Sequence, residues 1–426
     1  MRLPRVVPVT SAAALVLAAA PSPSAAAPPV LRWAGAVTVA TGDRVAEPQA
    51  AALAGGGALV AWRQNSGVRA AWVAPGGRIV RGERVAGGPA SDLRLAASRS
   101  GHAVLAWRRR GRVVVARAAR GGSFGQPTGV SAAGRRAYQP AVAAGARGAA
   151  LVAWQDHAGA QVRRARAGRA FGPARMILRR GSSPAVGFDA AQRGLAGALR
   201  RGRGARVVAR PVRGDGRLGA LQTVARAALD MNNLRLRVAP DGGAVAAWRE
   251  TDAAGLAPCA VAQRRPGAAA FRAPARLTGD CISLAPAVAA GGGGRWAASW
   301  LENSRTGLQL ALGSAAALQP LSDDQEASGE AVAFVRPGVV LAAWVQEGPG
   351  RSSVLARPVA WDGTPGATVA VGQGAGRLAP DLAGRVALAG GEGIAVAAWR
   401  ERPRAGLGDP RGAAGRLVVA TATLSG

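Results

Sequence analysis

The sequence predicts an all-β protein, an eight-bladed β-propeller of four-stranded antiparallel blades whose last blade is closed by the N-terminal strand. The first observation behind this prediction is a repeat of short apolar runs, each ending in a small residue followed by a large one. The eight endings are Ala61-Trp62, Ala106-Trp107, Ala153-Trp154, Ala198-Leu199, Ala247-Trp248, Ser299-Trp300, Ala343-Trp344 and Ala398-Trp399. They lie 45, 47, 45, 49, 52, 44 and 55 residues apart, and a period of this length with strand-like flanks is typical of propeller blades.

The repeat between Pro140 and Arg179 displays four strands most clearly. They are expected at residues 140–144, 149–154 and 161–166 and after Phe171-Gly172-Pro173. Glycine-rich turns between apolar runs of this length are typical of antiparallel sheets. The repeat at Leu199 lacks a tryptophan, but it lies midway between Trp154 and Trp248, so we count eight blades and not seven.

The two ends of the chain provide the second observation. After Trp399 only one strand remains, Arg416 to Thr423, so the last repeat lacks its fourth strand. Ahead of the first repeat lies an unassigned strand, Leu31 to Thr41, in which Trp33 stands where other repeats open their fourth strand with phenylalanine. We expect this strand to complete the last blade, because closing the ring removes an exposed sheet edge.

The paired small and large residues are expected to pack neighbouring blades together. Successive strand residues face opposite sides of a sheet, so the alanine faces one neighbouring blade and the tryptophan faces the other. The runs are apolar on both faces, which favours sheets buried on both sides. The alternative is an aromatic ring that lines a sugar-binding channel.

The first 27 residues resemble a secretory signal peptide. Arg2 and Arg5 precede an apolar stretch around residues 12–20, and small residues follow at 24–27. We therefore predict a signal peptide at residues 1–27 and a single propeller domain at 28–426. No segment approaches the ~20 apolar residues of a membrane span, and the predicted location is secreted or extracellular, with possible attachment to the cell envelope.

The only two cysteines, Cys259 and Cys281, are predicted to form a disulfide. Export makes a disulfide chemically plausible. In the repeat alignment Cys259 opens a third strand and Cys281 follows the fourth, and antiparallel pairing brings those two ends together. Two separate buried thiols are the alternative.

The net charge of +32 is large, and all 55 basic residues are arginine. An arginine-rich surface attracts polyanions in a salt-dependent way, so anionic cell-envelope polymers or glycans are the expected partners. Specific nucleic-acid recognition usually adds aromatic stacking, for which a chain with one tyrosine and five phenylalanines offers little. We therefore expect no specific nucleic-acid partner.

The polar residues that follow each repeat centre mark the predicted ligand face. Loops from second to third strands share one face of a propeller with the loops between blades, and acids concentrate there. Arginine runs such as residues 163–169 and 200–206 are expected on the outer strands and the opposite face. The predicted ligand-binding residues are Tyr138, Asp156, His157, Glu250, Asp252, Glu302, Glu347 and Glu401. A cation or a cationic ligand would suit these carboxylates, and an ordinary solvated surface is the alternative.

Catalytic and metal-binding patterns are weak. The two histidines cannot supply a three-histidine metal site, and spaced aspartate loops for a metal are missing from the sequence. Asp156-His157 beside Tyr138 is the best catalytic arrangement, but no third group completes it. We expect neither a metal nor another cofactor, and we leave open whether the protein is an enzyme while favouring a non-catalytic role.

Residues 238–248, Val-Ala-Pro-Asp-Gly-Gly-Ala-Val-Ala-Ala-Trp, resemble repeats in exported β-propeller proteins of high-GC actinobacteria and, more distantly, the sialidase-like propellers. The resemblance rests on structural positions and implies the fold. Sialidases carry Ser-x-Asp-x-Gly-x-x-Trp turns, an arginine triad and a tyrosine–glutamate pair; here the turn is missing and Tyr138 is the sole tyrosine.

The predicted function is therefore an exported non-catalytic binding or scaffold protein with its ligand on the acidic loop face. A sialidase-like glycoside hydrolase acting on extracellular glycans is the alternative.

Overall fold

The structure is a computed structural model. It describes residues 27–42, 44–227, 230–251, 254–278, 280–283, 286–302, 307–313, 318–322, 327–348, 351–373, 386–401 and 415–425. The predicted signal peptide, apart from residue 27, and the predicted ligand residue Asp252 lie outside these ranges.

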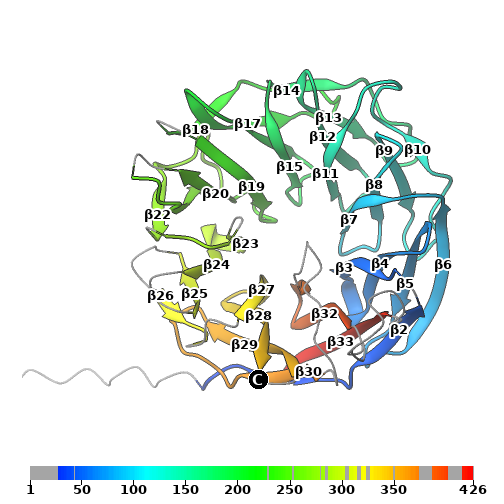
Figure 1. Cartoon of the computed structure of the whole chain (residues 1–426), viewed down its shortest axis with the longest axis vertical. Helices are drawn as coiled ribbons and strands as arrows, with labels where there is room; N and C mark the ends of the chain where they lie inside the picture. The colour runs from blue at the N-terminus through cyan, green and yellow to red at the C-terminus, as the bar shows by residue number, and fades with distance from the viewer. Residues whose placement is uncertain are drawn as a thin grey trace, which may run out of the picture.

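The described strands form eight antiparallel sheets arranged in a ring, with the first strand of each sheet innermost (Figure 1). The eight-bladed propeller is thus confirmed. Blade 1 consists of β3 (Ala46–Ala52), β4 (Ala58–Gln64), β5 (Gly67–Val73) and β6 (Ile79–Gly87), and blade 2 of β7 (Ser91–Ala97), β8 (Ala103–Arg109), β9 (Arg112–Ala118) and β10 (Thr128–Gly129). Blade 3 consists of β11 (Tyr138–Ala144), β12 (Ala150–Asp156), β13 (Gly159–Ala165) and β14 (Arg175–Arg179), and blade 4 of β15 (Ser182–Phe188), β16 (Gly194–Arg200), β17 (Ala205–Val212) and β18 (Gln222–Ala227).

Blades 5 to 8 continue the ring. Blade 5 consists of β19 (Asp230–Val238), β20 (Ala244–Thr251), β21 (Cys259–Arg264) and β22 (Ala275–Thr278), and blade 6 of β23 (Ala287–Ala290), β24 (Trp296–Glu302), β25 (Gly307–Leu312) and β26 (Leu318–Pro320). Blade 7 consists of β27 (Ala327–Arg336), β28 (Val339–Gly348), β29 (Arg351–Ala360) and β30 (Val369–Gln373). Blade 8 consists of β31 (Ala387–Gly391), β32 (Ile394–Glu401) and β33 (Gly415–Ser425) together with the N-terminal strands β1 (Val30–Trp33) and β2 (Val37–Gly42). Contact between β3 and β31 joins blade 8 to blade 1.

The N-terminal strand closes the ring as predicted, but it does so in two pieces. β1 pairs with the end of β33, where Trp33 lies opposite Ala422, and β2 pairs with its beginning, where Val37 lies opposite Val419. The break after Trp33 recurs in other blades. Phe124 and Phe171 likewise make single bridges to the third strand before the fourth strand begins.

Tryptophans fill the interfaces between blades, as the alternation of small and large residues predicted. Trp154 of blade 3 lies in one buried cluster with Ala106 of blade 2, and Trp107 of blade 2 lies in another with Ala61 of blade 1. Trp154 and Trp107 are each 1% exposed. Each tryptophan therefore faces the preceding blade and occupies the space beside its small residue, which supports the packing role.

The residue at the tryptophan position of blade 4 is Ala198, and the sequence alignment with Leu199 was wrong by one residue. In blade 3, Ala141 pairs with Ala153 immediately before Trp154. The equivalent pair in blade 4 is Ala185 with Gly197. Ala198 is therefore the counterpart of Trp154, and Leu199 is the counterpart of the next residue, Gln155. The burial pattern agrees, because Ala198 faces blade 3 whereas Leu199 packs toward blade 5.

The predicted disulfide is confirmed. Cys259, the first residue of β21, bonds to Cys281 beyond the end of β22, with their Cα atoms 5.5 Å apart. Such a bond is favoured in an oxidising compartment. The described helices are two three-residue 3-10 turns, Ala54–Gly56 and Gly292–Gly294, so none of them could span a bilayer.

Candidate ligand-binding site

Antiparallel strands place two sets of connections at one end of every blade. The turns from second to third strands and the connections from one blade to the next lie at this end, which we call the loop face. The predicted ligand residues within the described ranges all lie at it: Tyr138, Asp156, His157, Glu250, Glu302, Glu347 and Glu401. They are spread over blades 3, 5, 6, 7 and 8, so they do not form one cluster.

Two of these carboxylates are bound to the tryptophan of their own blade. The indole Nε1 of Trp248 donates to Glu250 at 2.8 Å, and that of Trp399 donates to Glu401 at 3.1 Å. Residues two apart on a strand face the same side, so the residue two positions after the tryptophan is placed to accept this bond. Glu401 also pairs with Arg416 at 3.2 Å. Sequence reasoning missed this role for the two glutamates.

Neutral residues accept the same bond in two other blades. Trp62 donates to Gln64 at 3.2 Å and Trp344 donates to Gln346 at 3.3 Å. An amide oxygen therefore suffices for this contact, and negative charge is not required. The polar residue two positions after the tryptophan is in these four blades an internal acceptor for a buried indole.

The other predicted carboxylates have different surroundings. Asp156 is buried, and its two oxygens accept from the Ala158 amide at 2.9 Å and from Gln161 Nε2 at 2.5 Å. Glu302 is also buried and accepts a bond from the Thr278 hydroxyl. Glu347 lies half-buried near the end of β28, opposite Ser352.

Tyr138 and the pair Asp156-His157 do come together at the loop face of blade 3. Tyr138 opens β11 directly opposite Gln155, and His157 is exposed in the adjoining turn. Arg108 of blade 2 lies over the Tyr138 ring at 5.3 Å. Glu302, by contrast, lies on blade 6, so Tyr138 and Glu302 are separated by two intervening blades.

In the described part of the chain, no three histidine, cysteine, aspartate or glutamate side chains gather as a metal site.

One arginine run lies on the loop face and not opposite it, which corrects the expected separation of charge. Residues 200–206 form the turn from β16 to β17, the same kind of turn that carries Asp156 in blade 3. The alignment of Leu199 in place of Ala198 with the tryptophans does not explain this error, because residues 200–206 follow the second strand in both alignments. The loop face therefore carries both signs of charge.

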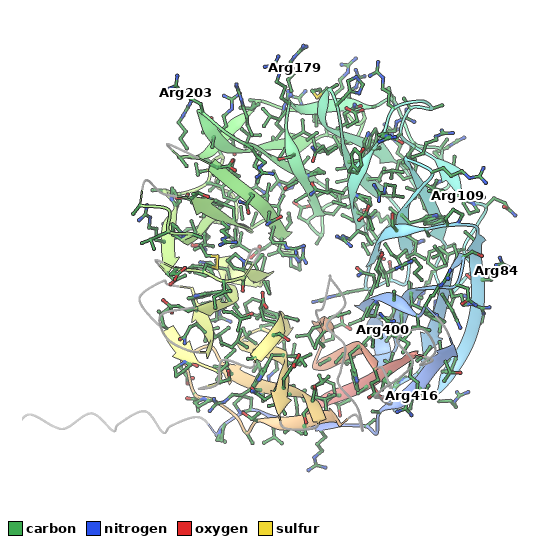
Figure 2. The ribbon with its side chains drawn as sticks, in the orientation of Figure 1. Arg84, Arg109, Arg179, Arg203, Arg400 and Arg416 are labelled. Carbon is green, nitrogen blue, oxygen red and sulfur yellow. A yellow bond between two sulfur atoms is a disulfide. The ribbon has the colours of Figure 1, made fainter. Side chains whose placement is uncertain are left out.

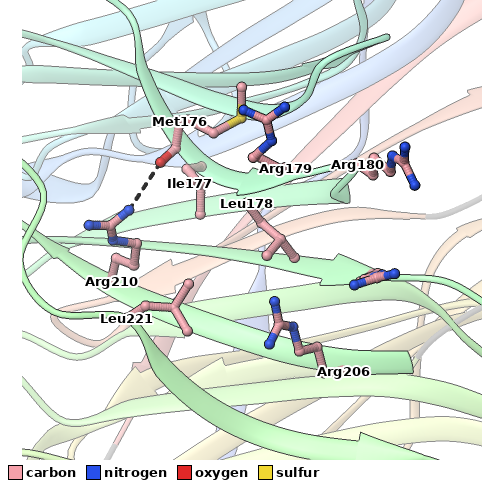
Figure 3. Close-up of a pocket in the computed structure, with 9 residues that line it drawn as sticks. Met176, Ile177, Leu178, Arg179, Arg180, Arg206, Arg210 and Leu221 are labelled. Atoms are coloured by element: carbon pink, nitrogen blue, oxygen red, sulfur yellow. Dashed lines mark hydrogen bonds between the residues drawn. The ribbon is translucent and has the colours of Figure 1, made fainter. Parts of the chain in front are cut away.

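A cleft of about 540 Å³ opens between blades 3 and 4 beside this arginine run (Figure 3). Its volume falls within the range of about 300–1,000 Å³ that is usual for small-ligand sites. Strand β14 contributes one wall, and strands of blade 4 contribute the other. The lining residues are Met176, Ile177, Leu178, Arg179, Arg180, Arg200, Arg206, Arg210 and Leu221.

The cleft combines an apolar floor with a cationic rim. Ile177 and Leu178 are buried, and Leu221 is 41% exposed at the opening. Arg210 crosses between the blades, because its Nε donates to the Gly219 carbonyl at 3.0 Å and its Nη1 donates to the Met176 carbonyl at 3.2 Å.

Five arginines line the cleft and no acidic residue does. Arg200 and Arg206 are direct cross-strand partners, and Arg206 is in turn opposite Arg226 on β18. Like charges placed directly opposite one another are unfavourable. The buried Nε of Arg206 has no hydrogen-bond partner among the described residues. A bound anion would relieve the repulsion between the paired arginines.

Other arginines of the chain serve the fold. Arg117 donates to the carbonyls of residues 166 and 169 in the next blade, at 3.3 and 2.6 Å, and Arg164 donates to the carbonyls of Gln192 and Val212 at 2.9 and 3.3 Å. Burial lowers the pKa of both guanidinium groups below the usual arginine value. Arg203 and the cleft residue Arg179, by contrast, project from the outer edge of the ring (Figure 2).

The turn that carries Asp156 and His157 borders the cleft. The Arg180 amide donates to the Ala158 carbonyl at 2.9 Å, so this turn contacts the connection between blades 3 and 4. The turn with Asp156 and His157 thus lies next to the cleft, whereas Tyr138 opens the innermost strand and contacts Arg108 of blade 2. The other described members, Glu250, Glu302, Glu347 and Glu401, belong to other blades.

Comparison with solved structures agrees with the fold. The BP39L lectin from Burkholderia pseudomallei is similar with a TM-score of 0.53 and 15% identity, covering 77% of this chain and 99% of its own. A PL25 polysaccharide lyase, an ulvan lyase, is similar with a TM-score of 0.51 and 10% identity, covering 79% of this chain and 98% of its own. The PL25 ulvan lyase bound to -[GlcA(1-4)Rha3S]- gives 0.50 and 11% over the same shares.

No protein-family model and no curated protein matches the sequence. Identities this low show a shared propeller fold and nothing about ligands. The resemblance to exported actinobacterial and sialidase-like propellers therefore stays a prediction.

Proposed function

We propose that this protein is an exported, non-catalytic binding protein that holds anionic glycans or other anionic envelope polymers on its arginine-rich surface. The observation that carries this proposal is the group of arginines around the blade 3 and blade 4 interface, which lines a cleft without any acidic residue. Charge that a fold does not compensate internally is available to an anionic partner.

The state of the predicted carboxylates supports the same conclusion. Asp156, Glu250 and Glu401 accept hydrogen bonds from their own blades, and Glu302 of blade 6 accepts one from Thr278 of blade 5. We propose that the loop face still contacts ligand at blade 3 through His157, because the turn that carries it contacts the cleft residue Arg180. Tyr138, which is 37% exposed on the innermost strand, is proposed as a separate contact on the same face. A cationic ligand on the acids of the other blades is the weaker proposal.

Glycans are chosen as the first probes because a lectin and a polysaccharide lyase are among the proteins of similar fold. The experiment measures binding of the full chain, expressed with export, to polygalacturonate, to neutral galactan and to several DNA duplexes of different sequence. We expect polygalacturonate to bind, the neutral polymer not to bind, and affinity to fall steeply between about 50 and 300 mM salt, since screening shortens the range of charge interactions.

Three results would contradict the proposal. Equal binding of galactan and polygalacturonate would exclude a charge-based site, and sequence-dependent binding to DNA would point to a nucleic-acid partner. Turnover of a fluorogenic glycoside panel that disappears in Tyr138→Phe or Glu302→Ala protein would establish the hydrolase alternative.

A further inference from the structure

We propose that the cleft between blades 3 and 4 is a discrete binding site for one anionic sugar unit, and that it lies at the interface where blade 4 carries Ala198 at the tryptophan position. The inference rests on the proposed function, since it names the site and the ligand class through which anionic glycans bind. Two features support it, the missing indole and the chemistry of the two walls.

The first feature is that the interface beneath the cleft lacks an indole. Of the eight buried clusters between neighbouring blades in the described structure, only the cluster between blades 3 and 4 contains no tryptophan. In it the small residue Ala153 of blade 3 meets Ala198, so both partners are small. Ile177 and Leu178 from β14 pack against this pair and form the cleft floor.

The same strand geometry aims the arginines into the space. Alternate residues of a strand face one side, so Arg200, two positions after Ala198, faces blade 3 with it. Val208 on β17 lies in the cluster with Ala198, and its neighbours two positions away are Arg206 and Arg210. Arg200, Arg206 and Arg210 therefore face the interface that lacks the indole.

The lining fits a sugar ring that bears a carboxylate or sulfate. Leu178 and Leu221 offer an apolar surface for the C–H face of a pyranose, and Arg200 and Arg206 offer adjacent guanidinium groups. Arginine binds planar and tetrahedral oxyanions through two parallel N–H donors. Arg210 is already bonded to two main-chain carbonyls and holds the walls together.

Binding of short oligosaccharides tests the site apart from the rest of the surface. The probes are trigalacturonate, a sulfated disaccharide and neutral trigalactose, titrated calorimetrically into the full chain at about 150 mM salt. The cleft variant is Arg200→Gln with Arg206→Gln. The matched control is Arg69→Gln with Arg84→Gln, which removes another pair of arginines that are cross-strand partners, on blade 1 and outside the cleft.

We expect the cleft variant to bind trigalacturonate or the sulfated sugar about 10 to 100 times more weakly, and the control variant to differ from the native protein by less than about twofold. Ala198→Trp should also weaken binding with every arginine retained, because an indole beneath Ile177 and Leu178 would displace the cleft floor. The other seven blades carry tryptophan at this position, so the fold has a place for it. Leu221→Glu, at an exposed position, provides the same test if that variant does not fold.

The outcomes separate the two proposals. Equal weakening by the cleft and control pairs would overturn the discrete site while leaving general polyanion binding intact. Unchanged affinity in both Ala198→Trp and Leu221→Glu would overturn the site as well. Failure of the native chain to bind trigalacturonate, the sulfated sugar and polygalacturonate would overturn the proposed function itself, and preference between the two charged sugars identifies the anionic group.

Discussion

The interfaces that blade 3 makes with its two neighbours differ at the tryptophan position and in the arginines beside it. Toward blade 2, Trp154 fills the space beside Ala106, and the interface is closed by apolar contact. Toward blade 4, Ala198 occupies the tryptophan position in a buried cluster without an indole, and a cleft lined by five arginines lies above this cluster. If the proposed site is correct, the binding interface is the one interface of the described clusters that lacks the packing tryptophan.

The two interfaces share their other main contact. On the face opposite the loops, Arg117 reaches from blade 2 to carbonyls of blade 3, and Arg164 reaches from blade 3 to carbonyls of blade 4. Arg117 lies over the ring of Phe171 at 5.3 Å, and Arg164 lies over Phe188 at 5.0 Å. The cleft is therefore tied at its far end by the same kind of contact that ties the closed interface.

Removing the indole from the closed interface should have the largest effect. Trp154→Ala would convert it into a second small-to-small interface and should lower the free energy of unfolding by about 3–5 kcal/mol, because the cavity cannot collapse fully. Urea denaturation measures the loss. A cost below about 1 kcal/mol would contradict the packing role, and loss of ligand binding without loss of stability would favour an aromatic recognition surface.

The shared arginine contact provides a smaller and more symmetrical test. Arg164→Ala and Arg117→Ala should each cost about 1.5–3 kcal/mol, since each removes charged hydrogen bonds to main-chain carbonyls. If the interfaces differ only in the indole, the two losses measured by urea denaturation should agree within about 0.5 kcal/mol. A much larger loss for Arg164→Ala would mean that the interface between blades 3 and 4 depends on this arginine contact more than the interface between blades 2 and 3 does.

Most of the fold followed from the repeat, and the errors came from assuming that every repeat keeps its large residue. Leu199 was matched to the tryptophans because it is the largest residue near the expected centre. Leu301 and Val345 stand directly after their tryptophans, so an apolar residue at that position was available as a signal that Leu199 belongs there. The bulge that fixes the register lies in the first strand and has no comparable signature in the sequence.

The candidate site was predictable only in part. The loop face and the blade 3 residues Tyr138, Asp156 and His157 could be placed from strand order alone. The bonds from Trp248 to Glu250 and from Trp399 to Glu401 could have been suspected, because Gln64 and Gln346 occupy the same position without charge. The cleft could not be predicted, since it depends on which of two adjacent residues faces blade 3.

Asp230 offers the smallest expected effect and acts on the open interface from outside the cleft. Its carboxylate accepts from the amides of Gly202 and Met231, each at 2.9 Å, and pairs with Arg201 at 3.1 Å, which fixes the turn between Arg200 and Arg206. Partial burial tends to raise the pKa of Asp230, but these hydrogen bonds and Arg201 outweigh it and hold the pKa below the usual aspartate value.

A lowered pKa in the folded state fixes the sign of the pH dependence. The stabilisation is fully present above the unfolded-state pKa of about 3.9 and is lost as pH falls through the lower, folded-state value. Asp230→Asn should therefore destabilise the protein at pH 6 by about 0.5 kcal/mol, as for an exposed ion pair, and the difference in urea denaturation should disappear in acid. It should also weaken binding of a sulfated sugar, whose charge is constant over this range, because the turn that positions Arg200 and Arg206 loosens. Native affinity at pH 6 in the variant would show that the cleft holds its arginines without Asp230.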